Sequence, residues 1–569
     1  MIGLVAVTRS GRAAAQRLAA TWPDARLYRE GEPASIALPK AFGECDAIVC
    51  FLAVGATVRL IAPLLRGKAQ DPGVVCVDEA LRYAVPVLGA HAGGGNELAG
   101  RVAELLGAEP VITTASDAAG VTALDDFGAD LGFTIEPGSD LAAVGTAILS
   151  GERVTLTADA TWPLPALPPN VVPADRPEPA IPAIVVTDRI VDFPERAVIF
   201  RPASLIVGAG SSRHAPAAEI GQLIDATLAD LELSPRSVRY LATVDAKADE
   251  KGLLAAAAER GWRVVTFGAG ELAEVPVPNP SEVVRRAVGT PSVAEAAALI
   301  DPDATLLAAK RTSAHATVAV ARCRPRGRLT VIGIGPGARD LMTPRAVAGL
   351  RRAAVVAGLD SYLDQVSDLL RPGTKVLASG LGAEQERAAE AVAQAQAGHA
   401  VALIGSGDAG VYAMGSPALE LADDRIDVTA VPGVTAALAA AAVLGAPLGH
   451  DHVMISLSDL HTAWPVIERR IMAAGEGDLV ACFYNPASAK RDWQLRRALE
   501  LLAARRPPGT PVGWVRDATR PGQAASVSTL AEFDPGQVDM HTLVVVGSSR
   551  TRVLAGRMVT PRDYRWADG

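Results

Sequence analysis

The chain has 569 residues, of which 49% are apolar and 21% charged, and its formal net charge is −9. This length exceeds what one hydrophobic core organises, so we expect roughly three or four domains. The apolar content excludes a largely disordered chain, and the negative charge without any basic tract argues against a nucleic-acid partner.

Neither the cysteines nor the apolar stretches indicate export or a membrane. The five cysteines are scattered without a CxxC pair, so we expect no protein metal site, no disulfide framework and a cytoplasmic location. The start "MIGLVAVTRSGR" places its apolar run before its arginines, the reverse of a secretory signal. The longest apolar stretch, "TAALAAAAVLGAPLG", is broken by Gly and Pro and is shorter than the ~20 residues of a membrane span.

Short β-rich runs alternate with Ala/Leu/Arg-rich helical patterns along the whole chain, which predicts a multidomain α/β protein. Runs at 2–8, 47–54 and 74–77, followed by a helix from Asn96, indicate a first α/β domain over 1–127. Eight prolines between Trp162 and Pro182 exclude an interior strand or helix there, so 128–200 is interpreted as a connecting domain with an irregular segment.

A new α/β rhythm starts at "SLIVGAGSS" (204–212) and continues through "YLATVDAK" and "WRVVTFGAG" to "TVAVAR". This pattern predicts a third domain over 201–321. The basic, Pro/Gly-broken stretch "RCRPRGR" (322–328) is interpreted as a linker to a last module over 329–569.

The stretch "GIGPGARDLMTPRA" (333–346) follows a predicted strand, and its glycines allow two interpretations. Gly333, Gly335 and Ala338 fit the dinucleotide pattern G-x-G-x-x-G/A, with Asp360 about twenty residues further on. However, Thr343-Pro344 predicts the helix start well after Ala338, which separates the loop from the helix dipole. A loop for a different cofactor is therefore favoured over an NAD turn or a plain structural turn.

Five ordered motifs decide between these readings. They are "GIGPGARDLMTPRA", "GSGDAGVYAMGSP" (405–417), "VPGVTAALAAAAVLGAPLGHDHVMISLSDL" (431–460), "FYNPASAKR" (483–491) and "TLVVVGSSRT" (542–551). Together they closely resemble the tetrapyrrole methyltransferases, in particular those that methylate carbon 17 of precorrin-3B and contract the ring. The resemblance covers 329–569 and implies a two-lobed fold, S-adenosylmethionine as cofactor in a cleft between two α/β halves, and a homodimer.

The resemblance also implies a set of site residues. Methyl transfer needs positioning more than a strong acid or a metal, which suits small residues and backbone groups. By resemblance, the cofactor is contacted by Pro336, Ser406, Gly407, Asp408, Val411, Thr435 and Ala436. Asp408 suits a sulfonium or a ribose hydroxyl, or alternatively orders its own loop.

Four further residues complete the expected methyltransferase site. Tyr484 and Asn485 are expected to stack on and hydrogen-bond the cofactor or the macrocycle, or else to form a simple turn. His450 and Asp451 are candidates for acid/base help in ring contraction, with a polar loop histidine as the alternative. Many relatives carry Asp where this chain has Ala338, a change that favours the carbon-17 group.

The first part of the chain resembles the cobalt-precorrin-5A hydrolases, through residues 58–120 and through "VDAKADEKGLLAAAAERGWRVVTF" and "AVGTPSVAEAAAL" in 204–321. The resemblance implies opening of a ring-A lactone with release of acetaldehyde. Within "GAHAGGGNELA", His91 is the candidate base, and Asp78, Glu79 and Asp117 are alternatives to it. A purely structural turn role for His91 also stays open.

Backbone N–H groups near the start of the following helix are expected to bind substrate. Gly94, Gly95 and Asn96, with Asn96 capping a helix from Glu97, are suited to hold an oxyanion. In "VGAGSSRHA", Arg213 and His214 are expected to bind the carboxylates of a corrinoid, with phosphate binding or a plain turn as alternatives.

The sequence thus predicts a bifunctional enzyme of corrin-ring synthesis. Small α/β hydrolase-like domains precede a two-lobed methyltransferase fold, and cobalt enters only as part of the substrate. Two alternatives stay open: a non-catalytic corrinoid carrier in the first part, and methylation of a different precorrin carbon by the last module.

Overall fold

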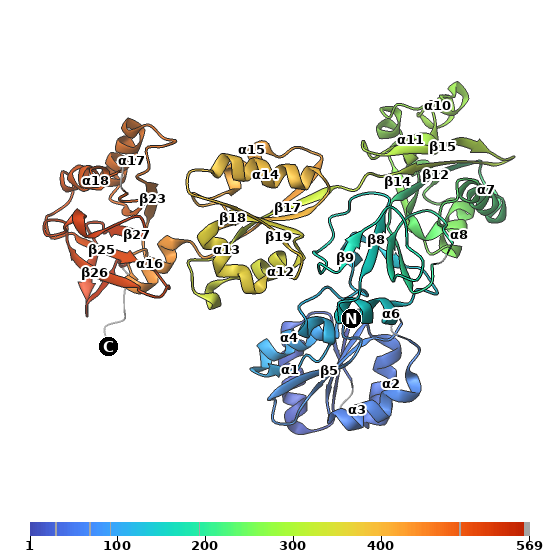
Figure 1. Ribbon diagram of the computed structural model, residues 1–569, viewed down its shortest axis with the longest axis horizontal. Helices are drawn as coiled ribbons and strands as arrows, with labels where there is room; N and C mark the ends of the chain where they lie inside the picture. Colours follow the sequence, from blue (N-terminus) through green and yellow to red (C-terminus); the bar gives the residue numbers. More distant parts are fainter. Residues whose placement is uncertain (29–30, 68–69, 92, 193, 489–490, 563–569) are drawn as a thin grey trace. The chain divides into compact units, whose positions relative to one another are not determined.

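The computed structural model describes residues 1–28, 31–67, 70–91, 93–192, 194–488 and 491–562, so motif positions 489 and 490 lie outside it. The chain divides into two compact units (Figure 1). The first consists mainly of Met1–Ala160 and Leu167–Pro325, and the second mainly of Arg326–Leu370 and Thr374–Gly569. Among the residues that the structure describes, no helix combines the length and the apolar character that crossing a bilayer requires.

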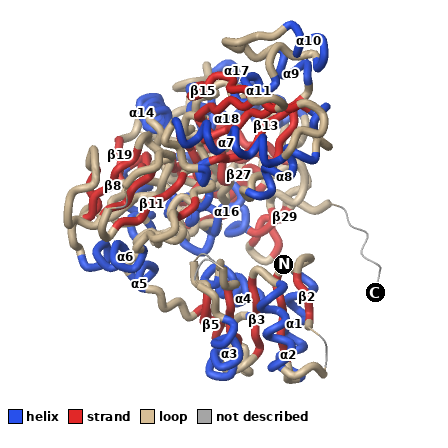
Figure 2. Tube along the Cα trace, turned by 90° about the vertical axis from the view of Figure 1, so that its right-hand side faces the viewer, coloured by secondary structure: helices blue, strands red, loops and turns tan. Residues whose placement is uncertain are grey.

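The first unit begins with a sheet in the strand order β2-β1-β3-β4-β5-β6. Strands β2, β1, β3 and β4 are parallel, and β5 runs antiparallel to β4. The strands point apolar side chains to both faces of the sheet, so both faces need a cover. Helices α1 and α4 cover one face, and α2 and α3 cover the other (Figures 1 and 2). The elements are β1 (Ile2–Ala6), α1 (Arg9–Thr21), β2 (Ala25–Leu27), α2 (Ala34–Glu44), β3 (Ala47–Phe51), α3 (Val54–Ile61), β4 (Gly73–Val77), β5 (Tyr83–Leu88), α4 (Gly95–Leu106), β6 (Glu109–Pro110) and α5 (Ala115–Ala118).

A second sheet, in the order β7-β11-β10-β8-β9, is formed by the region interpreted from the sequence as a connecting domain with an irregular segment. Part of that prediction is wrong, because β9 lies inside the proline-rich stretch and pairs with β8. An edge strand tolerates proline because one side of its backbone needs no ladder partner. The elements are β7 (Thr134–Ile135), α6 (Leu141–Ser150), β8 (Val154–Ala158), β9 (Val171–Pro173), β10 (Ala183–Val186) and β11 (Ala197–Arg201).

A third sheet, in the order β14-β13-β12-β16-β15, completes the first unit. Helices α7 and α8 pack on one face, and α9 to α11 pack mainly on the other. The elements are β12 (Leu205–Ser211), α7 (Ala217–Asp230), β13 (Val238–Val244), α8 (Lys251–Glu259), β14 (Val264–Phe267), α9 (Ala269–Ala273), α10 (Glu282–Val288), α11 (Val293–Ala298), β15 (Thr305–Thr312) and β16 (Ala316–Arg322).

The second unit starts with an all-parallel sheet in the order β19-β18-β20-β17-β21. Helices α14 and α15 cover one face, and α12 and α13 the other (Figure 1). The elements are β17 (Gly327–Gly333), α12 (Pro344–Arg352), β18 (Val355–Leu359), α13 (Asp360–Val366), β19 (Lys375–Ser379), α14 (Glu384–Gln396), β20 (Ala400–Gly405), α15 (Gly415–Leu421) and β21 (Ile426–Val431).

A mixed sheet in the order β23-β24-β27-β25-β26 forms the second lobe of this unit, with α17 and α18 on one face and α16 on the other. A small sheet in the order β22-β29-β28 accompanies it. The elements are α16 (Ala436–Leu444), β22 (Gly445–Ala446), β23 (His452–Ser456), α17 (Trp464–Glu476), β24 (Val480–Tyr484), α18 (Gln494–Ala503), β25 (Pro511–Arg516), β26 (Ala524–Thr529), β27 (Thr542–Val546), β28 (Arg552–Leu554) and β29 (Arg557–Val559).

Glu219 of α7 ties that helix to the turn between β15 and β16. Its carboxylate accepts hydrogen bonds from Ser313 Oγ at 2.5 Å and from the backbone N–H of His315 at 2.7 Å, and His315 Nδ1 lies 3.0 Å away. The hydroxyl of Ser313, followed by the donors of His315, lowers the pKa of Glu219 to about 2.

We expect Glu219→Gln to lower the stability of the chain at about pH 6, with the difference from wild type shrinking as the pH falls from the ordinary glutamate range toward about 2. The sign follows because a carboxyl with a depressed folded pKa contributes stability above its unfolded pKa and loses it on acidification. Denaturant midpoints measured over this pH range test the expectation. A wild-type minus variant difference that is independent of pH contradicts it.

Candidate functional site

A cavity of about 220 Å³ lies in the second unit, where loops of its two lobes meet. The first lobe contributes the segments that follow β17, β20 and β21, and the second contributes β24 and the segments around β25 and β27. The carboxyl ends of neighbouring parallel strands are the usual place for a ligand crevice in such a sheet. The lining residues expected from the sequence are Pro336, Ser406, Gly407, Val411, Thr435, Ala436, Tyr484 and Asn485.

Three glycines bring the loops of this cavity together backbone to backbone. A Cβ atom on Gly333 would lie 2.6 Å from the carbonyl oxygen of Gly407, and a Cβ on Gly433 would overlap the same oxygen. Gly335 and Gly407 also exchange backbone hydrogen bonds, at 3.0 and 2.7 Å. The glycines therefore serve loop-to-loop packing at the floor of the cavity.

The predicted helix start after the glycine loop is confirmed. Thr343 is the N-cap, its hydroxyl accepts from Ala346 N–H at 3.2 Å, and α12 begins at Pro344. The loop is therefore separated from the helix N-terminus, against the geometry of a pyrophosphate-binding turn.

Arg520 connects the second lobe to these loops and was not foreseen from the sequence. Its Nε donates to the carbonyl of Pro336 at 2.7 Å and its Nη2 to Ser406 Oγ at 3.0 Å. The neighbouring Thr519 accepts a bond from Ala338 N–H at 3.2 Å and has a φ of 68°, in the left-handed region. The sequence "DATRPGQ" around Arg520 indicates only a Pro/Gly turn and gives no sign of a contact with the glycine loops.

Tyr484 occupies the wall of the cavity with its hydroxyl fully engaged. That hydroxyl lies 2.6 Å from Thr435 Oγ1 and accepts from Ala437 N–H at 3.0 Å. Burial raises the pKa of Tyr484, so the phenol stays protonated at neutral pH. Asn485 has a φ of 52°, and its amide donates to Ser456 Oγ at 3.1 Å.

Asp408 differs from the other expected cofactor contacts because it is not among the residues that line the cavity. Its carboxylate accepts from the N–H of Gly410 at 2.8 Å and from that of Gly433 at 3.0 Å. These bonds agree with the alternative that Asp408 orders its loop, because both carboxylate oxygens accept hydrogen bonds from nearby backbone N–H groups.

His450 and Asp451 lie in the turn between β22 and β23 and do not line this cavity. His450 Nδ1 accepts from the N–H of Asp451 at 2.8 Å. Another acid/base pair does line it: His541 Nδ1 lies 3.8 Å from Asp517 Oδ1.

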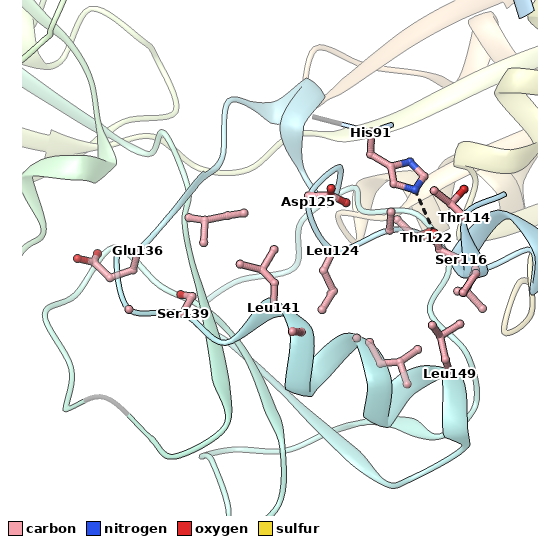
Figure 3. A pocket seen from close by; sticks show the side chains of 18 of the residues that line it. His91, Thr114, Ser116, Thr122, Leu124, Asp125, Glu136, Ser139, Leu141 and Leu149 are labelled. Atoms are coloured by element: carbon pink, nitrogen blue, oxygen red, sulfur yellow. Dashed lines mark hydrogen bonds between the residues drawn. The ribbon is translucent and has the colours of Figure 1, made fainter. Parts of the chain in front are cut away.

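A larger cavity, of about 700 Å³, lies in the first unit and is lined in part by His91 (Figure 3). His91 Nε2 is 3.0 Å from Ser116 Oγ and 3.4 Å from Asp117 Oδ2. The same oxygen of Asp117 accepts from Asn96 Nδ2 at 2.9 Å and from Thr114 Oγ1. The structure thus gathers His91, Ser116 and Asp117 from segments that follow two neighbouring strands, β5 and β6.

The wall of this cavity is mostly apolar. It includes Val121, Leu124, Ile135, Leu141, Ile148 and Leu149, which are provided by the segment after α5, by β7 and by α6 (Figure 3). A ligand here meets a largely apolar surface with some polar groups, among them His91 and Ser116, the composition of many small-molecule sites.

The other two candidate bases lie at the opposite edge of the sheet from His91. Asp78 and Glu79 follow the end of β4, whereas the loop after antiparallel β5 returns to the start of β4 at Gly73. At about 3.3 Å per residue, a five-residue strand separates the two edges by more than 10 Å.

Asp78 and Glu79 also have local partners. Burial tends to raise the pKa of Asp78, but hydrogen bonds from the backbone N–H groups of Tyr83, Arg82 and Ala80 outweigh this effect and lower it. Glu79 accepts from the hydroxyls of Thr8 and Ser10.

The glycine loop after His91 differs from the expectation. Helix α4 starts at Gly95, with Gly94 as N-cap at a φ of 69°, so the prediction that Asn96 caps a helix from Glu97 is wrong. The N–H groups of Gly94, Gly95 and Asn96 donate to the carbonyls of His91, Gly89 and Ala90. These donors are engaged within the loop, because its tight glycine turn folds its own carbonyls onto the helix start.

Arg213 and His214 lie after β12 and are exposed. His214 has a φ of 62°, and its N–H donates to Glu250 Oε1 at 2.8 Å. Neither residue lines the two cavities described above. Across the described ranges, no cluster of three or more His, Cys, Asp or Glu side chains could hold a metal ion.

Comparison with known families matches almost the whole chain. Residues 37–117, 122–202 and 205–321 match the cobalamin synthesis G N-terminal, cobalamin biosynthesis central region and cobalamin synthesis G C-terminus families, respectively. Residues 328–534 match the Tetrapyrrole (Corrin/Porphyrin) Methylases.

Three relatives illustrate the similarity. The probable cobalt-factor III C(17)-methyltransferase of Salmonella typhimurium is 48% identical over 42% of this chain and 99% of its own length. The precorrin-3B C(17)-methyltransferase of a Sinorhizobium species is 40% identical over 42% and 98%, respectively. The cobalt-precorrin-5A hydrolase of Priestia megaterium is 35% identical over 50% of this chain and 80% of its own length. Several further relatives are matched over about half of their own length.

We expect Gly433→Ala to destabilise the second unit by about 1–3 kcal/mol and to weaken ligand binding in its cavity, because the added methyl group overlaps the carbonyl of Gly407. Gly410→Ala is the matched control in an adjoining loop, since its Cβ would approach nothing closer than Asp408 Oδ1 at 3.4 Å. Denaturation midpoints and calorimetric titration with S-adenosylhomocysteine measure both effects. Equal behaviour of the two variants contradicts the packing role.

Proposed function

Because the chain belongs to the tetrapyrrole methylase family through its second unit and to the cobalt-precorrin-5A hydrolase family through its first, we propose that it is a bifunctional enzyme of corrin-ring synthesis. The second unit transfers a methyl group from S-adenosylmethionine to carbon 17 of precorrin-3B or cobalt-precorrin-3 with ring contraction. The first unit opens the ring-A lactone of cobalt-precorrin-5A and releases acetaldehyde.

The single observation that carries the methyltransferase proposal is the 220 Å³ cavity. Every expected cofactor contact except Asp408 lines it, although these residues come from four separate stretches of the chain. The donor set fits S-adenosylmethionine, because hydroxyls, backbone groups and a glycine floor can contact a nucleoside and an amino-acid moiety without metal ligands.

When bound, S-adenosylmethionine supplies an electrophilic methyl group on a sulfonium. The role of the chain is then to orient and to exclude water. Pro336, Ser406, Thr435 and Ala436 would hold the donor, and Arg520 fixes the first two of these by its hydrogen bonds. Two pairs of residues could accept or donate a proton during ring contraction. They are His450 and Asp451, the candidates that the sequence offers, and His541 and Asp517 in the cavity wall.

For the hydrolase, His91 is proposed as the base that takes a proton from the attacking water. The Asp117 carboxylate, 3.4 Å from Nε2, stabilises the imidazolium that forms. Asn96 supports this step by its bond to Asp117. Arg213 and His214 are proposed contacts for substrate carboxylates because both residues are exposed. Gly94 and Gly95 would contact substrate only if their N–H groups exchanged the bonds that they now make within the loop.

We assign 1–127, 128–200 and 201–321 to the hydrolase, with hydrolase-like α/β domains at either end of this region. We further assign 322–328 to the linker and 329–569 to the methyltransferase. Cobalt belongs to the substrate in this proposal, because it would arrive inside the macrocycle and needs no ligand cluster from the protein. A cytoplasmic enzyme that dimerises through the methyltransferase part completes the proposal.

We expect calorimetry to detect binding of S-adenosylhomocysteine, and mass analysis to detect one added methyl group after incubation with S-adenosylmethionine and precorrin-3B. Arg520→Met should weaken donor binding about ten-fold, because it removes both hydrogen bonds to the cofactor loops. Arg550→Met, at an exposed position outside the cavity, is the control. Binding of NADH without binding of the demethylated by-product S-adenosylhomocysteine would overturn the assignment.

We expect His91→Gln to reduce acetaldehyde release from cobalt-precorrin-5A at least 100-fold, the usual scale for loss of a general base. Asp117→Asn should reduce it less, because the base itself remains. His541→Gln, in the second unit, serves as the control for a general effect of losing a histidine. Tight corrinoid binding without any acetaldehyde from the wild-type chain would instead support a carrier function.

A further inference from the structure

Tyr412 is placed differently from the other aromatic residue on the same cavity wall. It lies in the segment between β20 and α15, lines the cavity and is 54% exposed. The expected cofactor contacts are more deeply placed: Thr435 is only 6% exposed, and Pro336 and Gly407 are buried. The phenol ring therefore lies toward the mouth of the cavity.

The backbone of Tyr412 is strained. Its φ of 51° falls in the left-handed region, which bulky residues rarely adopt because Cβ crowds the following carbonyl. Glycine or asparagine would occupy this position with less strain. Such conformations persist where the surroundings hold them, and they are concentrated at ligand sites.

Two contacts fix the ring. The hydroxyl donates to the carbonyl oxygen of Met454 at 2.7 Å, and the ring meets that of Tyr484 with centroids 5.1 Å apart and planes at 60°. Tyr484 is itself held by Thr435 and by the N–H of Ala437. The exposed ring is consequently pre-organised, since neither its backbone nor its hydroxyl is left to rotate freely.

We propose that Tyr412 is a substrate-binding residue whose ring stacks on the conjugated face of the tetrapyrrole. The inference rests on the proposed methyltransferase function. A flat, conjugated ligand larger than the cavity must lie at its mouth, where Tyr412 is exposed, while the donor occupies the deeper part lined by Thr435 and Pro336. An aromatic ring fixed in advance contributes stacking without further ordering of its side chain.

The test compares Tyr412→Asn with Tyr412→Phe in the full chain. The probes are uroporphyrin III, a stable octacarboxylate tetrapyrrole followed by its absorption, and S-adenosylhomocysteine. We expect Tyr412→Asn to weaken porphyrin binding about ten-fold, on the scale of loss of one stacked aromatic, and to leave affinity for S-adenosylhomocysteine within about two-fold. Tyr412→Phe keeps the ring and should change porphyrin affinity by no more than about three-fold.

Thermal stability separates a binding role from a structural one. Asparagine tolerates the left-handed φ, so Tyr412→Asn should melt no lower than Tyr412→Ala, which also lacks the ring but keeps the strain. A Tyr412→Trp variant adds a direct signal, because its emission should be quenched by bound porphyrin. Tyr83→Trp, in the first unit and not among the residues that line this cavity, gives the background for that signal.

Three results would overturn the inference. The first is porphyrin affinity unchanged in Tyr412→Asn. The second is an equal loss of S-adenosylhomocysteine affinity, which would assign the ring to the adenine of the donor. The third is a wild-type chain that binds S-adenosylhomocysteine but no porphyrin. A wild-type chain that binds neither probe would instead remove the proposed methyltransferase function itself.

Discussion

The cavity of the second unit depends on the close backbone contact among Gly333, Gly407 and Gly433. Each glycine follows or ends one of three neighbouring parallel strands, so their loops converge at one edge of the sheet. Any side chain at Gly333 or Gly433 would meet the carbonyl of Gly407. Because the loops touch through their backbones, Ser406, Thr435 and Pro336 can approach one ligand from different parts of the chain. Arg520 then adds the second lobe to the same floor through its two hydrogen bonds.

Close backbone contacts between glycines also shape the first unit, where they position a catalytic candidate. Gly73, Gly93 and Gly95 bring the start of β4 against the turn after β5, and this contact fixes the loop that carries His91. The antiparallel direction of β5 is decisive, because it returns the chain to the edge opposite Asp78 and Glu79. His91 is therefore grouped with Ser116 and Asp117, beside an apolar cavity. A partly buried ion pair between Asp188 and Arg322, at 2.6 Å, ties the second sheet of this unit to the third.

The two cavities suit the two proposed reactions for different reasons. The methyltransferase cavity gathers hydroxyls, backbone groups and small residues from separate loops, as a reaction governed by alignment requires. The hydrolase cavity is lined by a histidine whose Nε2 lies 3.4 Å from the carboxylate of Asp117, as a reaction that moves protons requires. Backbone in the left-handed region is concentrated at the cavity of the second unit, at Tyr412, Asn485, Asp517 and the neighbouring Thr519. The surrounding fold holds this local strain.

The sequence by itself determined the α/β alternation, the first strands and helices, and the late start of α12 at Thr343-Pro344. These features depend on local periodicity and on capping, which neighbouring residues decide. It also identified eight of the residues that line the cavity of the second unit, because the ordered motifs are specific to the family.

Only the tertiary structure decided which polar groups meet. It united His91 with Ser116 and Asp117 and separated Asp78 and Glu79 from them. It turned Asp408 onto the backbone of Gly410 and Gly433. It also brought Arg520, Tyr412 and the His541–Asp517 pair to the cavity of the second unit. It also showed that a proline-rich stretch can supply an edge strand, at β9. The physical reason is the same in each case: strand direction, sheet order and the hydrogen bonds between distant loops depend on how the whole chain packs, and no local pattern of residues encodes them.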